Sequence, residues 1–308
     1  MISVGGLNLL PQELGSTVVT IGKFDGIHLG HQALLQATLA IAEELLLVPT
    51  VVTFDRHPGS YLSPDAYPFP IIGPTQKNEL LDQAGIELLV TLPFDEALAS
   101  LSAEEFVQQI LLTALSAKAV VVGDDFRFGS GQQGNVEALR QLGLLHGFLV
   151  HTVPAVEVDG VRVATTHIRN LLEKGDVKHA ERFLGRLHAT RGEVEHGLKI
   201  GRELGFPTAN ISRLAEGFLP LDGVYAGWLH TKSERYPAAL SIGINETISA
   251  VPRLLEVHVL DRRDLDLYDQ QVNVEYVDFI RPSFKFSGVE ELISSINADL
   301  VKIRAILV

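Results

Sequence analysis

The chain has 308 residues, 46% of them hydrophobic and 20% charged, so it is long enough for two globular cores. Its formal net charge of −13 argues against a nucleic-acid partner, because such a partner would be repelled overall. The absence of cysteine excludes disulfides, thiolate metal sites and cysteine nucleophiles.

Neither secretion nor membrane insertion is indicated. The opening MISVGGLNLLPQELG lacks the basic start and long apolar core of a signal peptide. No apolar run approaches the roughly 20 residues that span a bilayer. We therefore expect a cytoplasmic enzyme with no membrane partner and no nucleic-acid partner. A homo-oligomer is left open.

In the first half of the chain, strand and helix patterns alternate strictly. β-Branched runs predict strands at 16–22, 48–54, 86–94, 117–126 and 148–156. Helical periodicity follows each of them, at 30–46, 75–85, 102–116, 134–147 and 165–186. This alternation predicts an α/β domain with a doubly wound, mostly parallel sheet over residues 1–185. Ligands of such sheets bind beyond the carboxyl ends of the strands.

The pattern changes after Arg186. Short strands are predicted at 189–197, 223–230, 235–243, 253–260 and 270–280, with turns and no helices between them. Residues 186–308 therefore indicate a small antiparallel barrel or sandwich. The last segment, 288–307, is amphipathic and predicts a terminal helix that packs on this domain.

The stretch TIGKFDGIHLGHQALL, residues 20–35, places two histidines where a strand turns into a helix. His28 and His31 are one helical turn apart, and Gly30 removes a side chain between them. A helix N-terminus offers free N–H groups and partial positive charge, and imidazoles can add hydrogen bonds to phosphate. The pattern predicts a phosphate site. Polar surface histidines are the alternative, and zinc is less favoured because no third ligand is evident.

A second motif, GDDFRFGSGQQG, follows the strand at 117–126. Phe126 and Phe128 alternate with Arg127, so both rings should point to one side. Such rings can hold a flat aromatic ligand. Judged without other information, however, they are more typical of a core.

A third motif, HGLKIGRELGFPTANI, is rich in glycine but lacks the Gly-Lys-Ser/Thr ending of a P-loop. Its glycines still allow backbone N–H groups to wrap a phosphate chain. A rigid loop between strands is the alternative interpretation of GFPTAN.

The segment IGKFDGIHLGHQALL closely resembles the adenylyltransferase signature of the prokaryotic bifunctional riboflavin kinase/FMN adenylyltransferase family, the bacterial FAD synthetases. Further segments resemble the same family in order along nearly the whole chain: VVTFDRHPGSYLSP, VVVGDDFRFGSGQQGN, VEVDGVRVATTHIRNLLEKGDVKHAERFLGR, HGLKIGRELGFPTANI, DGVYAG, LEVHVLD and IRPSFKF. The resemblance implies a Rossmann-like nucleotidyltransferase domain followed by a riboflavin kinase barrel.

For the first domain, the resemblance implies transfer of AMP from ATP to FMN, giving FAD and pyrophosphate. It assigns His28 and His31 as catalytic. It implies that ATP and its phosphates are bound by Gly22, Phe24, Gly30, Arg162, Thr165, Thr166 and Arg169. It implies that the flavin is bound by Asp125, Phe126 and Phe128. The chain departs from the family at Ala164, where serine is usual, and at His167, where a basic residue is frequent. A helix N-cap made by Thr165 or Thr166 is compatible with these roles.

For the second domain, the resemblance implies phosphorylation of riboflavin by ATP. Thr208 and Asn210 correspond to residues that hold Mg²⁺ with the ATP phosphates, and hydroxyl and amide oxygens suit that ion. Gly197 and Gly201 correspond to the phosphate-wrapping loop. Glu256 matches the carboxylate that accepts the proton of the ribityl 5′-hydroxyl.

The kinase half carries the larger departures from the family pattern. Ser241, Glu246 and Ile248 stand where asparagine, proline and phenylalanine are usual, and Asp269 stands where glycine is common. A differently shaped flavin-side loop would follow, because proline and glycine set backbone shapes that other residues do not.

Three functional hypotheses result. The first is a bifunctional enzyme that converts riboflavin to FMN and FMN to FAD. The second is an enzyme with only the adenylyltransferase site active, its barrel serving flavin binding or assembly. The third is a non-catalytic flavin-responsive regulator, which the retained site residues disfavour.

Overall fold

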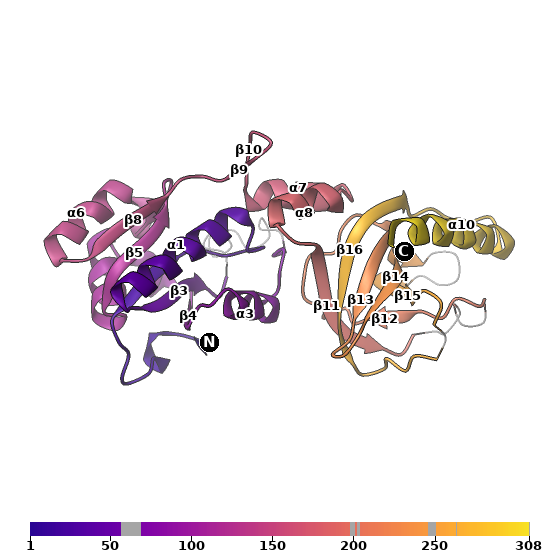
Figure 1. Cartoon of the computed structure of the whole chain (residues 1–308), viewed down its shortest axis with the longest axis horizontal. Helices are drawn as coiled ribbons and strands as arrows, with labels where there is room; N and C mark the ends of the chain where they lie inside the picture. Colours follow the sequence, from indigo (N-terminus) through magenta and orange to yellow (C-terminus); the bar gives the residue numbers. More distant parts are fainter. Residues whose placement is uncertain (57–68, 198–200, 202–203, 246–250, 263, 308) are drawn as a thin grey trace. The chain divides into compact units, whose positions relative to one another are not determined.

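The computed structural model describes residues 1–56, 69–197, 201, 204–245, 251–262 and 264–307 (Figure 1). The chain forms two compact units. The first comprises Met1–Phe69 and Lys77–Val163, and the second comprises Pro70–Gln76 and Ala164–Val308. Residues 164–185, predicted as the end of the first domain, therefore pack with the second unit. The functional division at 185/186 stays a prediction.

The first unit is built on a parallel sheet of six strands, in the order β1-β4-β3-β2-β5-β8 (Figure 1). The strands are β1 (Ile2–Val4), β2 (Thr17–Ile21), β3 (Val48–Phe54), β4 (Leu88–Leu92), β5 (Ala117–Gly123) and β8 (Leu149–Val153). The doubly wound parallel sheet is confirmed. The strand order reverses between β2 and β5, so the carboxyl ends of these two strands form the switch point, the place where ligands of such sheets usually bind. β1 was not predicted, since three residues are too few to show a pattern.

Helices cover both faces of this sheet. They are α1 (Leu29–Leu45), the part of α3 (Pro74–Gln83) that begins at Lys77, α4 (Glu96–Ser100), α5 (Ala103–Phe106), the π-helix η3 (Val107–Ala114) and α6 (Val136–His146). On β2, Val18 packs toward Ala42 of α1, whereas Val19 belongs to the core formed with Phe106 and Leu139. Both faces of β2 are thus buried, which explains its unbroken apolar run. The predicted helix 102–116 is two pieces, because its hydrogen bonds change to π spacing after Phe106.

The second unit contains a closed six-stranded antiparallel barrel in the order β11-β12-β15-β14-β13-β16. Its strands are β11 (His188–Glu195), β12 (Ala209–Ile211), β13 (Gly223–His230), β14 (Arg235–Asn245), β15 (Val251–Val259) and β16 (Gln271–Pro282). Pairing of β11 with β16 closes the ring, so the open choice between barrel and sandwich is settled as a barrel. The predicted terminal helix is α10 (Val289–Leu307), whose Leu300 and Ile303 pack on Ala226 of the barrel.

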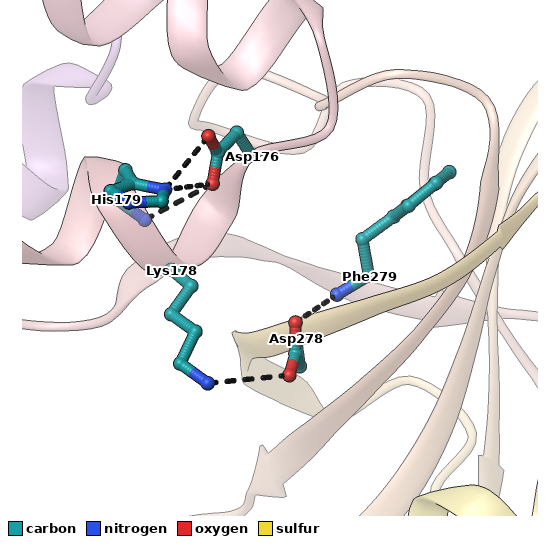
Figure 2. Close-up of polar contacts among 5 residues, drawn as sticks. All are labelled: Asp176, Lys178, His179, Asp278 and Phe279. Carbon is teal, nitrogen blue, oxygen red and sulfur yellow. Dashed lines mark hydrogen bonds and ion pairs between the residues drawn. The ribbon is translucent and has the colours of Figure 1, made fainter.

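The predicted helical segment 165–186 is a pair of helices, α7 (Thr165–Glu173) and α8 (Val177–Leu184). They are separated at Gly175, whose φ of +77° is a conformation that favours glycine. Figure 2 shows the polar contacts at the start of α8 and between α8 and β16. The Asp176 carboxylate caps α8 and lies 2.8 Å from Nδ1 of His179, and Lys178 pairs with Asp278 of β16 at 3.7 Å. The Lys178–Asp278 ion pair therefore links α8 to the barrel, while Asp176 stabilises the start of the helix.

A buried histidine makes the barrel sensitive to acid. His188 is 2% exposed, and its Nε2 lies 2.6 Å from the Phe218 carbonyl oxygen, to which it can donate. Burial lowers the pKa of His188 from 6.5 to about 4. As the pH falls from 6.5 toward 4, His188 therefore binds a proton in the unfolded chain but stays neutral in the folded barrel. We expect this one residue to remove about 3 kcal/mol of the free energy of unfolding over that range.

Urea unfolding at several pH values, followed by fluorescence, tests this prediction. The single tryptophan, Trp228, lies on β13 and so reports on the barrel. His188→Gln should flatten the pH dependence of the midpoint, even though the substitution lowers stability at neutral pH. The exposed His146 supplies the control variant His146→Gln, which should retain the wild-type slope. An unchanged slope in His188→Gln would refute the assignment.

Candidate functional site

The two predicted catalytic histidines lie at the start of α1, directly beyond the carboxyl end of β2. His28 is the N-cap of α1, and its Nδ1 accepts a hydrogen bond of 3.3 Å from the His31 backbone N–H. The two imidazole rings stack, with centroids 3.7 Å apart and planes inclined by 12°. His28 is 6% exposed and His31 is half-buried. The structure thus brings both imidazoles to the helix N-terminus at the switch point of the sheet.

The turn before His28 is unusual in its backbone. Phe24, Gly26 and Ile27 have φ angles of 49°, 82° and 38°, all in the left-handed region. Phe24 and Ile27 are not glycine and are almost completely buried, so surrounding contacts must hold them in this conformation. The Phe24 ring lies 5.1 Å from the His31 ring and supports it.

Two glycines make room for these rings. A Cβ on Gly22 would lie 3.1 Å from the Phe24 ring, and a Cβ on Gly30 would lie 3.2 Å from Cε1 of His28. Gly30 therefore lets the His28 ring fold against the helix end, a role that its spacing alone did not reveal. Ligand contacts by Gly22, Phe24 and Gly30 stay predictions.

Beyond β5, the neighbour of β2, the structure joins two residues predicted from separate motifs. The Arg162 guanidinium, on β10 (Val161–Arg162), donates to the Asp125 carboxylate at 2.5 Å. Phe126 and Phe128 stack at 5.5 Å, as expected for rings on one side of a strand. Phe128, on β6 (Arg127–Phe128), is only 6% exposed and belongs to the core. Phe126 is thus the ring of the pair with more accessible surface.

Helix α7, which carries predicted phosphate-binding residues, has a different N-cap residue from Thr165 or Thr166. Ala164 occupies the N-cap and makes no side-chain hydrogen bond, so an N-cap by Thr165 or Thr166 is wrong. Alanine stands where the family usually has serine, and it leaves capping to other groups. Thr165, Thr166 and Arg169 belong to the second unit, and their convergence with His28 and His31 stays a prediction.

In the barrel, strand register aligns the residues predicted for phosphoryl transfer. Asn210 of β12 lies directly opposite Glu256 of β15, and Glu256 lies opposite Ser241 of β14. Directly opposed side chains share one face, with Cβ atoms about 5 Å apart. Burial raises the pKa of Glu256, which suits a base that must accept a proton near neutral pH. The segment GFPTAN, alternatively interpreted as a loop, contributes the start of β12.

Two glycines of the glycine-rich motif, Gly197 and Gly201, pack close to Asn210 and Thr208. A Cβ on Gly197 would overlap the Asn210 amide, and a Cβ on Gly201 would lie 3.3 Å from Oγ1 of Thr208. Only glycine therefore lets the loop approach so closely. Thr208 and Asn210 offer hard, neutral oxygen ligands beside the Glu256 carboxylate, so the donor set fits Mg²⁺ bound together with phosphates. Within the described residues no cluster of three or more His, Cys, Asp or Glu side chains suits a metal.

A hollow that is open to solvent lies beside Thr208 and Asn210. Thr208, Asn210 and Gly197 line it, as do Arg262 and Tyr268, which the sequence did not single out. Tyr268 is held by stacking on His196 at 3.9 Å. In the sequence, Arg262 and Tyr268 could have been noticed as a charged and an aromatic residue within the segment DRRDLDLYD.

Of the departures from the family pattern, one is explained. Asp269 has a φ of 59°, in the left-handed region that glycine favours and that aspartate tolerates better than most residues. Its N–H donates to the Val194 carbonyl at 3.0 Å, so the turn is kept. Ser241 lies beside Glu256, as described above. Glu246 and Ile248 lie outside the described residues.

Each half of the chain matches a family of known proteins. The FAD synthetase family model matches residues 10–167, and the riboflavin kinase family model matches residues 184–307. A bifunctional riboflavin kinase/FMN adenylyltransferase from Pseudomonas fluorescens is 38% identical over 304 residues, covering 98% of this chain and 97% of its own. The protein of that name from Haemophilus influenzae is 35% identical over 303 residues, covering 98% of both chains.

A crystal structure from Streptococcus pneumoniae, named as a macrolide-efflux protein, is similar over 98% of both chains, with a TM-score of 0.87 and 33% identity. Its name concerns that protein alone. In the part of this chain that the structure describes, no helix is long and apolar enough to cross a membrane.

Proposed function

The chain belongs to the bifunctional riboflavin kinase/FMN adenylyltransferase family, and we propose from this membership that it makes FAD from riboflavin in two ATP-dependent steps. It is a transferase: ATP phosphorylates riboflavin to FMN, and a second ATP donates AMP to FMN, giving FAD and pyrophosphate. The observation that carries this conclusion is the match of both family models, in order, along one chain that retains both clusters of site residues.

Activity at the adenylyltransferase site alone is not favoured. The riboflavin kinase family model covers residues 184–307, Asn210 lies opposite Glu256, and Gly197 and Gly201 lie close to Asn210 and Thr208. A non-catalytic flavin regulator would have no need to retain this arrangement together with His28 and His31.

For adenylyl transfer, we propose direct attack of an FMN phosphate oxygen on the α-phosphorus of ATP. The bond from the α-phosphorus to the bridging oxygen breaks, and pyrophosphate leaves. His28 and His31 donate hydrogen bonds to the charge that develops on the phosphates. The remaining contacts to ATP are assigned to Gly22, Phe24, Gly30, Arg162, Thr165, Thr166 and Arg169. The contacts to the flavin are assigned to Asp125, Phe126 and Phe128. The reaction requires positioning and charge stabilisation and no covalent enzyme intermediate.

For phosphorylation of riboflavin, we propose that Glu256 accepts the proton of the ribityl 5′-hydroxyl as its oxygen attacks the γ-phosphorus of ATP. Backbone amides near Gly197 and Gly201 hold the phosphate chain. Thr208 and Asn210 would hold Mg²⁺, which neutralises charge on the ATP phosphates. We assign this step to residues 186–308, adenylyl transfer to residues 1–185, and both to the cytoplasm.

One assay tests the function as a whole. The purified full chain is incubated with riboflavin, ATP and Mg²⁺, and the flavins are separated by chromatography. Accumulation of FAD supports the bifunctional assignment. FAD formed only when FMN is supplied would instead show that the adenylyltransferase alone is active, and conversion of neither flavin would refute the proposal.

A further inference from the structure

The turn that carries His28 must be held from outside. Its left-handed residues Phe24 and Ile27 are buried non-glycine residues, a conformation that persists only when neighbouring contacts enforce it. Both imidazoles follow this turn within a few residues, and His28 caps the helix. A small change in the backbone here would therefore displace the two rings together.

Three side chains from three elements bind the backbone of this turn. The Lys23 carbonyl oxygen accepts a hydrogen bond from Nζ of Lys77, at 2.9 Å, and one from Oγ1 of Thr53, at 3.2 Å. At the other end, Nε2 of Gln32 donates to the Ile27 carbonyl at 3.0 Å. The turn is thus fixed at both ends, by α3 and β3 before Phe24 and by α1 after Ile27.

Lys77 differs from the other two because it carries charge. It lies on α3 and is half-buried, and burial lowers its pKa while the nearby Asp25 carboxylate acts in the opposite direction. Burying an ammonium group costs free energy unless the group is hydrogen-bonded and paired with an opposite charge. Its bond to Lys23, 54 positions away, puts a cation beside the turn that leads to the histidines. A protein with a net charge of −13 needs such local cations where an anionic substrate binds.

We propose that Lys77 is a positioning residue for adenylyl transfer: its ammonium holds the Lys23 carbonyl and thereby orients His28 and His31. This proposal rests on the proposed function for its kinetic consequence, but the orientation of the rings can be measured without turnover. In this proposal Lys77 acts through its hydrogen bond to the turn and not by direct contact with the reacting atoms.

The test compares two variants. Lys77→Met keeps the length of the side chain but removes the hydrogen-bond donor and the charge, whereas Lys77→Arg keeps the donor and the charge. Lys118→Met is the matched control, because Lys118 is exposed on β5 of the same unit. With saturating FMN and ATP, Lys77→Met should lose about 100-fold in kcat for FAD formation, as expected for a misplaced catalytic group. KM for ATP should change little, Lys77→Arg should recover most of the loss, and riboflavin phosphorylation in the same protein should stay at the wild-type rate.

A second readout uses ¹⁵N-labelled histidine in the ligand-free full chain. The ring signals of His28 and His31 should shift in Lys77→Met, return in Lys77→Arg and stay unchanged in Lys118→Met. Wild-type kcat or unshifted ring signals in Lys77→Met would overturn the proposal, as would equal loss of both activities together with a lower unfolding temperature. If the wild-type chain makes no FAD from FMN, the proposed function fails, while the ring signals still decide the role of Lys77.

Discussion

Replacing His31 by alanine is expected to remove nearly all conversion of FMN to FAD, while riboflavin is still phosphorylated to FMN. The His31 ring stacks on His28 at the N-terminus of α1, where it can donate to a phosphate that gains charge in the transition state. Loss of one such donor costs roughly 100-fold to 1,000-fold in turnover. The measurement is the rate of each flavin product, resolved by chromatography, starting once from riboflavin and once from FMN.

His31 is a better choice than His28 for this experiment. Nδ1 of His28 caps α1, so removing His28 would also cost helix stability and mix two effects. The exposed His146 provides the control, since His146→Ala should leave both rates unchanged. Equal loss of FMN and FAD formation in His31→Ala would contradict the assignment of the two steps to separate sites.

Glu256→Gln is expected to produce the opposite pattern. Glutamine keeps the shape of the side chain but cannot accept the hydroxyl proton, so FMN formation should fall by roughly 100-fold to 10,000-fold. Conversion of supplied FMN to FAD should continue at the wild-type rate. The control is Glu290→Gln, an exposed carboxylate in the first turn of α10.

The pH dependence of FMN formation gives a second test of Glu256. Burial raises its pKa, and a base works only when ionised, so the rate should fall with decreasing pH at a higher pH than for an ordinary glutamate. This acid limb should disappear from the residual activity of Glu256→Gln. Retention of the wild-type rate and the same limb in that variant would show that another group is the base.

Much of the fold could be predicted from local patterns. Strict alternation of strands and helices predicted the doubly wound sheet, and helix-free strands predicted the antiparallel domain, because each periodicity reflects which face a segment buries. The site residues could be named because they lie in short continuous motifs. His28 with His31, and Thr208 with Asn210, are separated by so few positions that any fold of the motif keeps them close.

Features that depend on contacts between distant segments could not be predicted. Lys77 reaches Lys23 across 54 positions, and Asn210 meets Glu256 only because the barrel sets the register of β12 against β15. The packing of residues 164–185 with the barrel unit is likewise set by neighbours far along the chain. Sequence by itself determined most of the strands and helices and indicated which motifs are candidates for the chemistry, since these follow from neighbouring residues. Only the tertiary structure decided which side chains bind the backbone of the turn before His28 and which carboxylate lies opposite Asn210, because burial and register come from packing between elements.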